Sequence, residues 1–145
     1  MKNTISTIFA FALIFVANFA NAQQITNEQQ KRFQTGSVEE FKKAFPKTSY
    51  NKCINVKDES FTPLAYASRF NKTEIFNYLL QNGADVNLAC KGTTPLMEAA
   101  KFDAPELVKI LLSKGADKSV KDSHGLTAKD YATQYKRTKV LELLK

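Results

Sequence analysis

The sequence is poor in the residues that define several protein classes. Its 145 residues include only 4 prolines and 5 glycines, which excludes collagen-like and low-complexity chains. Two cysteines are too few for a disulfide-rich scaffold or for a zinc site built from four thiolates. The single histidine and the lack of a glycine-rich phosphate loop leave few groups for an active site. The length suits one domain or one short repeat array, and it is too short for a barrel enzyme or two full domains.

Hydrophobic runs are also scarce, and the one long run lies near the N-terminus. Residues 8–17 are all apolar, and these ten residues fall well short of the roughly 20 that span a bilayer. Lys2 precedes the run, and Ala20-Asn21-Ala22 follows it. This order is typical of a secretory signal peptide cleaved after Ala22, with an uncleaved anchor or a buried helix as the alternative. No cysteine near the cut could carry a lipid anchor.

We therefore expect residues 1–22 to be an export signal and residues 23–145 to be the mature protein. The expected compartment is the periplasm, with the extracellular space as the alternative. Loss of Lys2 with the signal lowers the net charge from +7 to +6. A basic balance can indicate nucleic-acid binding, but an exported protein meets little DNA, so the charge favours an acidic partner or an envelope polymer. Nothing after residue 22 has the sequence of a second membrane span.

The rest of the chain repeats itself with a period of 32 to 33 residues. Thr-Pro-Leu at 62–64 returns at 94–96, and its threonine returns once more as Thr127. Gly-Ala-Asp at 83–85 returns at 115–117. Several independent matches in one register indicate a repeat architecture.

Each unit carries the signals of two helices followed by an extended loop. Thr62 and Thr94 can cap a first helix, because a threonine hydroxyl accepts a hydrogen bond from a free backbone N–H. The proline after each threonine suits the first helical position, where a missing N–H costs nothing. A second helix with apolar residues at helical spacing follows, and Gly83 and Gly115 can end it in a left-handed conformation. The predicted unit is helix, turn, helix and extended finger loop.

This pattern resembles the ankyrin repeat family, whose units open with Thr-Pro-Leu-His-x-Ala and continue to Gly-Ala-Asp-Val-Asn. Here residues 62–67 read Thr-Pro-Leu-Ala-Tyr-Ala, and residues 83–87 read Gly-Ala-Asp-Val-Asn. The chain departs from the family pattern at two kinds of position. The family histidine is replaced by Ala65 and Met97, and the usual turn glycine by Asn71, Asp103 and Lys136.

The resemblance implies an all-α solenoid that binds another protein and catalyses no reaction. We expect about four helix-turn-helix units, namely a cap unit at 24–57, repeats at 58–90 and 91–123, and a C-terminal cap unit at 124–145. The outer units are expected to be atypical, because their outer faces meet water. Such an array would act as a monomer without a cofactor.

The residues that could carry chemistry are scattered along the chain. His124, Cys53 and Cys90 fall in three different units, so we do not expect them to form a metal site or a catalytic pair. Asp58 and Glu59 are adjacent on an extended stretch, where neighbouring side chains point to opposite sides. We therefore predict no catalytic, cofactor-binding or metal-binding residue.

The two cysteines leave the question of pairing open. An oxidising compartment favours a disulfide between Cys53 and Cys90. Packed helical layers, however, lie roughly 10 Å apart, whereas a disulfide needs Cα atoms within about 7 Å. Two separate thiols are the alternative.

An aromatic residue recurs at one position of each unit. Phe70, Phe102 and Tyr135 are spaced by 32 and 33 residues, and the resemblance places them at the ends of first helices, which line the concave side. They could form a hot spot for a partner, or they could seal the core between units. The residues that we predict to contact a partner are Asp58, Glu59, Phe61, Arg69, Phe70, Lys91, Lys101, Phe102 and Tyr135.

The sequence as a whole predicts a non-catalytic protein-interaction module of the cell envelope. Its binding surface would be the concave face together with the finger loops. One alternative is an inhibitor, immunity or protective factor for a specific periplasmic enzyme, which would use the same surface. Another is a binder of anionic envelope polymers, whose affinity would fall steeply with salt.

Overall fold

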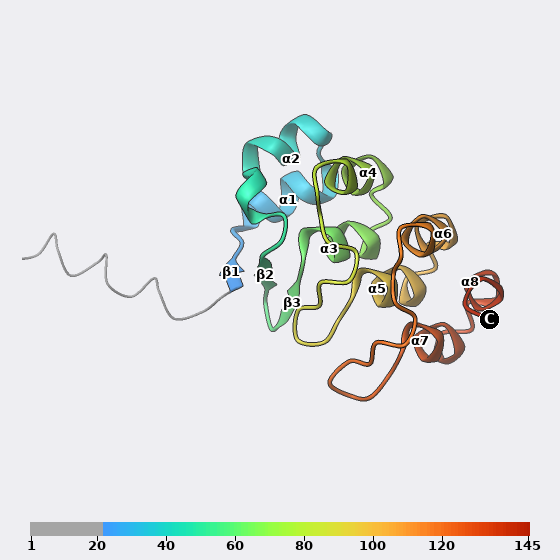
Figure 1. Ribbon diagram of the computed structural model, residues 1–145. Coiled ribbons are helices and arrows are strands. Elements are labelled where there is room, and N and C mark those ends of the chain that lie inside the picture. Colours follow the sequence, from blue (N-terminus) through green and yellow to red (C-terminus); the bar gives the residue numbers. More distant parts are fainter. Residues whose placement is uncertain (1–21) are drawn as a thin grey trace, which may run out of the picture.

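The computed structural model describes residues 22–145, so the predicted signal peptide at 1–22 lies outside this range except for Ala22. In the described part of the chain, helices follow one another in four successive pairs (Figure 1). A short 3-10 turn at Lys47–Ser49 follows the first pair. The helices are α1 (Asn27–Thr35), α2 (Val38–Ala44), α3 (Pro63–Arg69), α4 (Thr73–Gln81), α5 (Pro95–Lys101), α6 (Pro105–Ser113), α7 (Ala128–Gln134) and α8 (Thr138–Leu143).

The helix pairs stack on one another in two layers. Within the pairs, α1 packs on α2, α3 on α4, α5 on α6 and α7 on α8. Between the pairs, α3 packs on α5 and α5 on α7 in the layer of first helices, and α2 packs on α4 and α6 on α8 in the other layer. The loops that join one pair to the next project beyond the first helices (Figure 1). These loops are the finger loops that the sequence predicts.

The threonine caps that the sequence predicts are present at three of the first helices. The backbone N–H three residues further on donates to the hydroxyl oxygens of Thr62, Thr94 and Thr127, at 3.0, 3.2 and 3.2 Å. Pro63 and Pro95 occupy the first positions of α3 and α5. Each of these helices therefore begins at the residue that its local sequence specifies.

The turns inside the last three helix pairs use left-handed backbone. Asn71, Asp103 and Lys136 have φ values of 49°, 58° and 56°. This region strains most residues that carry a Cβ, which explains why glycine is the usual residue there. Asn and Asp tolerate it better than Lys does.

The expectation of an all-α fold needs correction at the first finger loop. There, β2 (Cys53–Val56) and β3 (Glu59–Phe61) form an antiparallel hairpin, and β1 (Ala22–Gln24) pairs with β2 in parallel. The hairpin turns at Lys57, whose φ is 55°. Half-buried and buried residues alternate along β2, as they do in a strand with one covered face. Cleavage after Ala22 would leave two of the three β1 residues in place.

Aromatic rings fill the core of the N-terminal pair. Phe33 of α1 packs edge-on against Phe41, Phe45 and Tyr66, with centroid distances of 5.2, 5.5 and 4.8 Å. Such pairs contribute about 0.5–1.5 kcal/mol each beyond the area that they bury. Because Tyr66 belongs to α3, the cluster also joins the first pair to the second.

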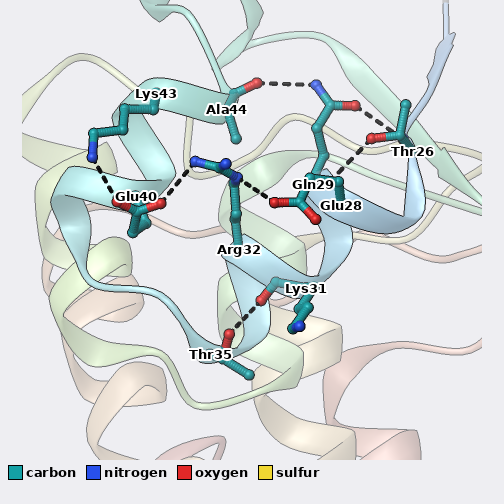
Figure 2. A network of polar contacts seen from close by, with 9 residues as sticks. All are labelled: Thr26, Glu28, Gln29, Lys31, Arg32, Thr35, Glu40, Lys43 and Ala44. Carbon is teal, nitrogen blue, oxygen red and sulfur yellow. Dashed lines mark hydrogen bonds and ion pairs between the residues drawn. The ribbon is translucent and has the colours of Figure 1, made fainter.

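A polar network on the surface orients α2 on α1 (Figure 2). Arg32 Nη1 of α1 lies 2.7 Å from Glu40 Oε2 of α2, and Lys43 Nζ lies 2.7 Å from the other Glu40 oxygen. The hydrogen bond and charge of Lys43 hold the pKa of Glu40 below its ordinary value. Gln29 Nε2 donates to the Ala44 carbonyl at 3.0 Å. Exposed ion pairs stabilise little individually, so the network chiefly fixes the geometry of this outer pair.

Candidate functional site

Phe70, Phe102 and Tyr135 follow directly on the ends of α3, α5 and α7. Their exposed fractions are 39%, 39% and 41%, and they are the large hydrophobic residues that stay exposed in residues 22–145. Part of each ring is covered. Phe70 meets Tyr66 of its own unit edge-on at 4.9 Å, and Arg69 of the preceding unit lies over Phe102. Sealing the core therefore accounts for only part of each ring, and the rest faces outward.

Cationic groups lie between the aromatic rings. The Arg69 Cζ atom lies 5.0 Å from the centre of the Phe61 ring and 4.9 Å from that of Phe102. Lys101 Nζ lies 5.6 Å from the Phe102 ring centre and 5.8 Å from that of Tyr135. All four distances fall within the roughly 6 Å range of cation–π attraction. We call Arg69, Phe70, Lys101, Phe102 and Tyr135 the aromatic–cation ladder.

An ion pair fixes the first cation of the ladder. Arg69 Nη1 lies 2.8 Å from Glu59 Oε2, and the Arg69 side chain is largely covered. Glu59 lies on β3, so the first finger loop holds Arg69 against its two rings. A guanidinium that is already ordered loses less side-chain entropy when a partner binds.

The prediction that Phe61 contacts a partner needs correction. Phe61 is only 2% exposed. It sits opposite Ile54 in the hairpin, its ring lies 5.7 Å from that of Tyr66, and Arg69 covers it. Phe61 is therefore a core residue that packs under the Arg69 side chain, and it is not a contact residue.

A hollow of about 230 Å³ opens where the finger loops meet the first helices. Three finger loops contribute to its wall, together with α5 and α7. We call it the Glu98 hollow. Although the chain has more basic than acidic residues, the charged side chains in the wall are mainly acidic. They are the carboxyls of Asp58, Glu59, Glu98 and Asp122 and the ammonium groups of Lys91 and Lys101.

A disulfide joins two of the finger loops that line this hollow. In the structure, Cys53 of β2 is bonded to Cys90 of the second finger loop, and their Cα atoms lie 5.8 Å apart. The helical layer spacing that argued against pairing does not apply here, because extended segments approach to about 5 Å. Beside the disulfide, Lys91 Nζ donates to the Asp58 carbonyl at 3.3 Å. The first and second finger loops are thus held together at the edge of the hollow.

A glycine allows the second and third finger loops to approach closely. Gly92 has a φ of +83°, and a Cβ at this position would lie 2.9 Å from the Cα of Asp122 and from the backbone nitrogen of Ser123. Only glycine satisfies both the left-handed backbone and the close contact. The second and third finger loops therefore meet backbone to backbone at Gly92.

Glu98 lines the hollow from α5 and is the residue that sequence analysis missed. It is 4% exposed, and its Oε2 atom has no hydrogen-bond partner. Burial raises the pKa of Glu98 to about 7, against the opposing influence of the Arg69 and Lys101 cations. One sequence signal could have identified it, because Tyr66 and Tyr131 occupy the matching position of the neighbouring units.

Asp122, by contrast, is committed to its own finger loop. Its Oδ1 atom accepts hydrogen bonds from the backbone N–H groups of His124 and Leu126, at 2.8 and 2.9 Å, and its Oδ2 atom accepts one from the Tyr131 hydroxyl. Burial alone would raise the pKa of Asp122, but these hydrogen bonds outweigh it and lower the pKa to about 2. This carboxylate shapes the third finger loop and is not available to a ligand.

The structure brings most of the predicted contact residues together. Asp58, Glu59, Lys91 and Lys101 line the Glu98 hollow, whereas Phe70 borders a second, smaller hollow beside Arg69. Across residues 22–145, no group of three or more His, Cys, Asp or Glu side chains could hold a metal ion. In the same residues, no helix is both long and apolar enough to cross a bilayer.

Two family models match the middle of the chain. The model described as "Ankyrin repeats (many copies)" matches residues 79–132, and the model described as "Ankyrin repeat" matches residues 60–91. Together they extend over residues 60–132, about half of the chain. This range contains α3 to α6, the disulfide partner Cys90, and Glu98 with the second and third finger loops.

Proposed function

The chain belongs to the ankyrin repeat family, whose members generally mediate protein–protein interactions, and from this premise we propose that it is an exported, non-catalytic module that binds one partner protein. The helix pairs form a short solenoid, and its concave face is made of the first helices and the finger loops. A surface of this kind is rigid before binding, so little conformational entropy is lost when the partner docks.

The aromatic–cation ladder is the observation that carries this proposal. It extends over three successive units and combines half-exposed rings with an ordered arginine. Aromatic and arginine side chains dominate the residues that contribute most to binding energy at protein interfaces. A partner that covers the ladder would bury the exposed parts of all three rings at once.

Replacing Phe70 or Phe102 by alanine should weaken partner binding by about 30-fold each, as expected for the loss of a hot-spot ring worth about 2 kcal/mol. The partner would first be captured by crosslinking to the wild-type protein and identified, and its affinity for purified variants would then be measured by calorimetry. Far-UV circular dichroism would show whether helical content is kept.

The matched control is the pair Glu106→Ala and Lys109→Ala on α6, in the layer of second helices. Both side chains are exposed and pair only with each other, so this variant should bind like the wild type. If the double variant F70A/F102A keeps both its helices and its affinity, the ladder is not the binding surface. If it loses helical signal, the rings act mainly in the core.

We place the protein in the periplasm on two supports: the signal-like sequence at 1–22 and the disulfide, since disulfides persist in oxidising compartments. Expressed in a Gram-negative host and fractionated, the protein should appear in the periplasm, beginning at Gln23 and lacking free thiols. Intact mass and thiol labelling measure both properties. A cytoplasmic protein that still begins at Met1 and reacts fully with a thiol reagent would contradict this location.

The alternative functions differ in how well the surface supports them. An inhibitor or protective factor for a periplasmic enzyme is one form of the proposed function, with that enzyme as the partner. Binding to an anionic polymer has less support, because carboxyls outnumber lysines in the Glu98 hollow.

A further inference from the structure

Two cations lie close to Glu98, yet both are engaged elsewhere. Arg69 forms its 2.8 Å ion pair with Glu59. Lys101 Nζ lies 5.4 Å from the centre of the Tyr131 ring and over the rings of the ladder. Both charges lower the pKa of Glu98 from a distance, but neither occupies its Oε2 atom, which stays without a hydrogen-bond partner.

The other charged groups of the hollow are also bonded elsewhere and do not pair with Glu98. Lys91 Nζ donates to the backbone carbonyl of Asp58. Asp122 accepts hydrogen bonds within its own finger loop and from Tyr131. Glu98 is therefore a buried carboxyl beside an open hollow, with neither a cation nor a donor at one oxygen. A buried carboxylate without a partner lowers the stability of the folded protein, unless a cation or a hydrogen-bond donor pairs with it.

We propose that the Glu98 hollow receives an arginine side chain of the partner protein, whose guanidinium pairs with the Glu98 carboxylate and lies against the Tyr131 ring. The inference rests on the proposed function, because it assigns the chemistry of one partner residue at the same surface. The ladder would contact the apolar part of the partner. The hollow would bind the partner's single arginine side chain and so fix the position of the partner on this surface.

The shape and chemistry of the wall favour arginine. A guanidinium is flat, sheds water more easily than an ammonium, and can give two parallel hydrogen bonds to one carboxylate. It also stacks on aromatic faces, and the Tyr131 ring lines the same hollow as Glu98. The volume of about 230 Å³ leaves room for one long side chain.

Arginine binding should depend on pH, because only the ionised carboxylate attracts a cation. Since the pKa of Glu98 is raised to about 7, an arriving guanidinium would favour ionisation and release a proton. Other charged and titratable groups face the hollow, and the test has to control for them. They are Arg69 on α3, Asp58 and Glu59 at the hairpin, Lys91 on the second finger loop, Lys101 on α5, Asp122 and His124 on the third finger loop, and Tyr131 on α7.

The test is a titration of the whole mature protein, labelled with ¹³C in its glutamate carboxyls, with Nα-acetyl-arginine amide. At pH 8 we expect a saturable shift of the Glu98 carboxyl signal. Between pH 8 and pH 6 the ionised fraction falls from about nine-tenths to about one-tenth, so the apparent Kd should rise roughly tenfold. Nα-acetyl-glutamate amide should leave the Glu98 signal unchanged.

Four variants make this test decisive. Glu98→Gln should abolish the tenfold pH effect and weaken binding at pH 8 by at least tenfold, whereas Glu98→Asp should keep part of both. Glu106→Gln, on exposed α6 surface, should bind like the wild type. His124→Asn should keep the pH effect, because the imidazole in the wall is not the proposed partner. The proposal is overturned if E98Q binds the arginine amide as well as the wild type, or if Glu98 does not respond at pH 8.

The proposed binding surface and the proposed arginine site at Glu98 can be disproved independently of each other. Once the partner is known, its affinity is compared for E98Q and for F70A/F102A. If only the ladder variant loses the partner, the proposed binding surface stands and the arginine receptor is wrong. If the arginine amide binds at Glu98 but neither variant affects the partner, the hollow binds guanidinium and the proposed surface is wrong.

Discussion

The double substitution Cys53→Ser and Cys90→Ser is expected to lower the free energy of unfolding by roughly 4 kcal/mol, the chain-entropy value for a loop of this length. The disulfide links residues separated by 37 positions. Such a closure removes conformational freedom mainly from the unfolded chain. For a mature domain of modest size, this loss is a large part of the total stability.

Urea denaturation followed by circular dichroism measures this effect, on wild type and variant, each with and without a phosphine reductant. Reduced wild type should unfold at about the same urea concentration as the variant, and the reductant should leave the variant unchanged. A difference below about 1 kcal/mol between oxidised wild type and variant would show that the folded loops, and not the covalent bond, supply the stability.

The disulfide should also affect the binding surface, because of where it lies. Cys90 exchanges two backbone hydrogen bonds with Thr93 inside the second finger loop, at 3.2 and 3.0 Å. Its partner Cys53 belongs to the strand that pairs with β1 and β3. Without the bond, the first and second finger loops lose their covalent connection, and the wall of the Glu98 hollow between Asp58 and Lys91 becomes less fixed.

The helices and their caps follow from local sequence, and this is why they could be predicted. A threonine hydroxyl reaches an N–H only three residues away, and a proline ring constrains its own φ. The left-handed turns at Asn71 and Asp103 are equally local. Each feature recurs at the same position of several units, so the repeat itself provided independent evidence for it.

The sheet could not be predicted in the same way, because it depends on contacts between distant segments. β1 pairs with β2, about thirty residues further along the chain. The sequence predicts Phe61 on the binding surface, but its place in the hairpin opposite Ile54 buries it. The cysteine pair raised the same difficulty, since helical spacing says nothing about how closely two extended loops approach.

Glu98 shows what repeat analysis overlooks. Comparing units emphasises what they share, whereas Glu98 differs from Tyr66 and Tyr131 at the matching positions. Its burial arises from the loops that fold over α5, and no local pattern reveals that. An ionisable residue at a position that neighbouring units fill with a ring is a sequence signal for such sites in repeat proteins, and its structural sign is an unpartnered buried oxygen.

Glu98→Gln is expected to stabilise the unliganded protein at pH 8 by roughly 3 kcal/mol and to leave its stability nearly unchanged at pH 4.5. Burial raises the pKa of Glu98 from 4.5 to about 7. The unfolded chain therefore loses this proton above about pH 4.5, while the folded protein keeps it until about pH 7. Between these values the folded state binds more protons, so the stability of the wild type falls as the pH rises. Glutamine cannot ionise and removes this fall.

Urea denaturation at several values between pH 4.5 and pH 8 measures the effect, with Glu106→Gln on exposed α6 as the matched control. The lowered pKa of Asp122 acts in a different window, because its stabilisation is lost only as the pH falls below about 4. Parallel stability curves for wild type and E98Q from pH 4.5 to 8 would contradict a buried, unpaired carboxylate at this position.

The same measurement connects the loss of stability caused by the buried Glu98 carboxylate with the proposed binding of an arginine. A ligand that binds only the folded state stabilises it by mass action. Saturating Nα-acetyl-arginine amide should therefore raise the stability of the wild type at pH 8 more than that of E98Q, and the difference should shrink towards pH 6. If Glu98 has only a structural role, E98Q would still be more stable than the wild type at pH 8. The arginine amide would then stabilise the wild type and E98Q equally. The size of the arginine-dependent difference thus measures how much of the penalty at Glu98 an incoming guanidinium offsets.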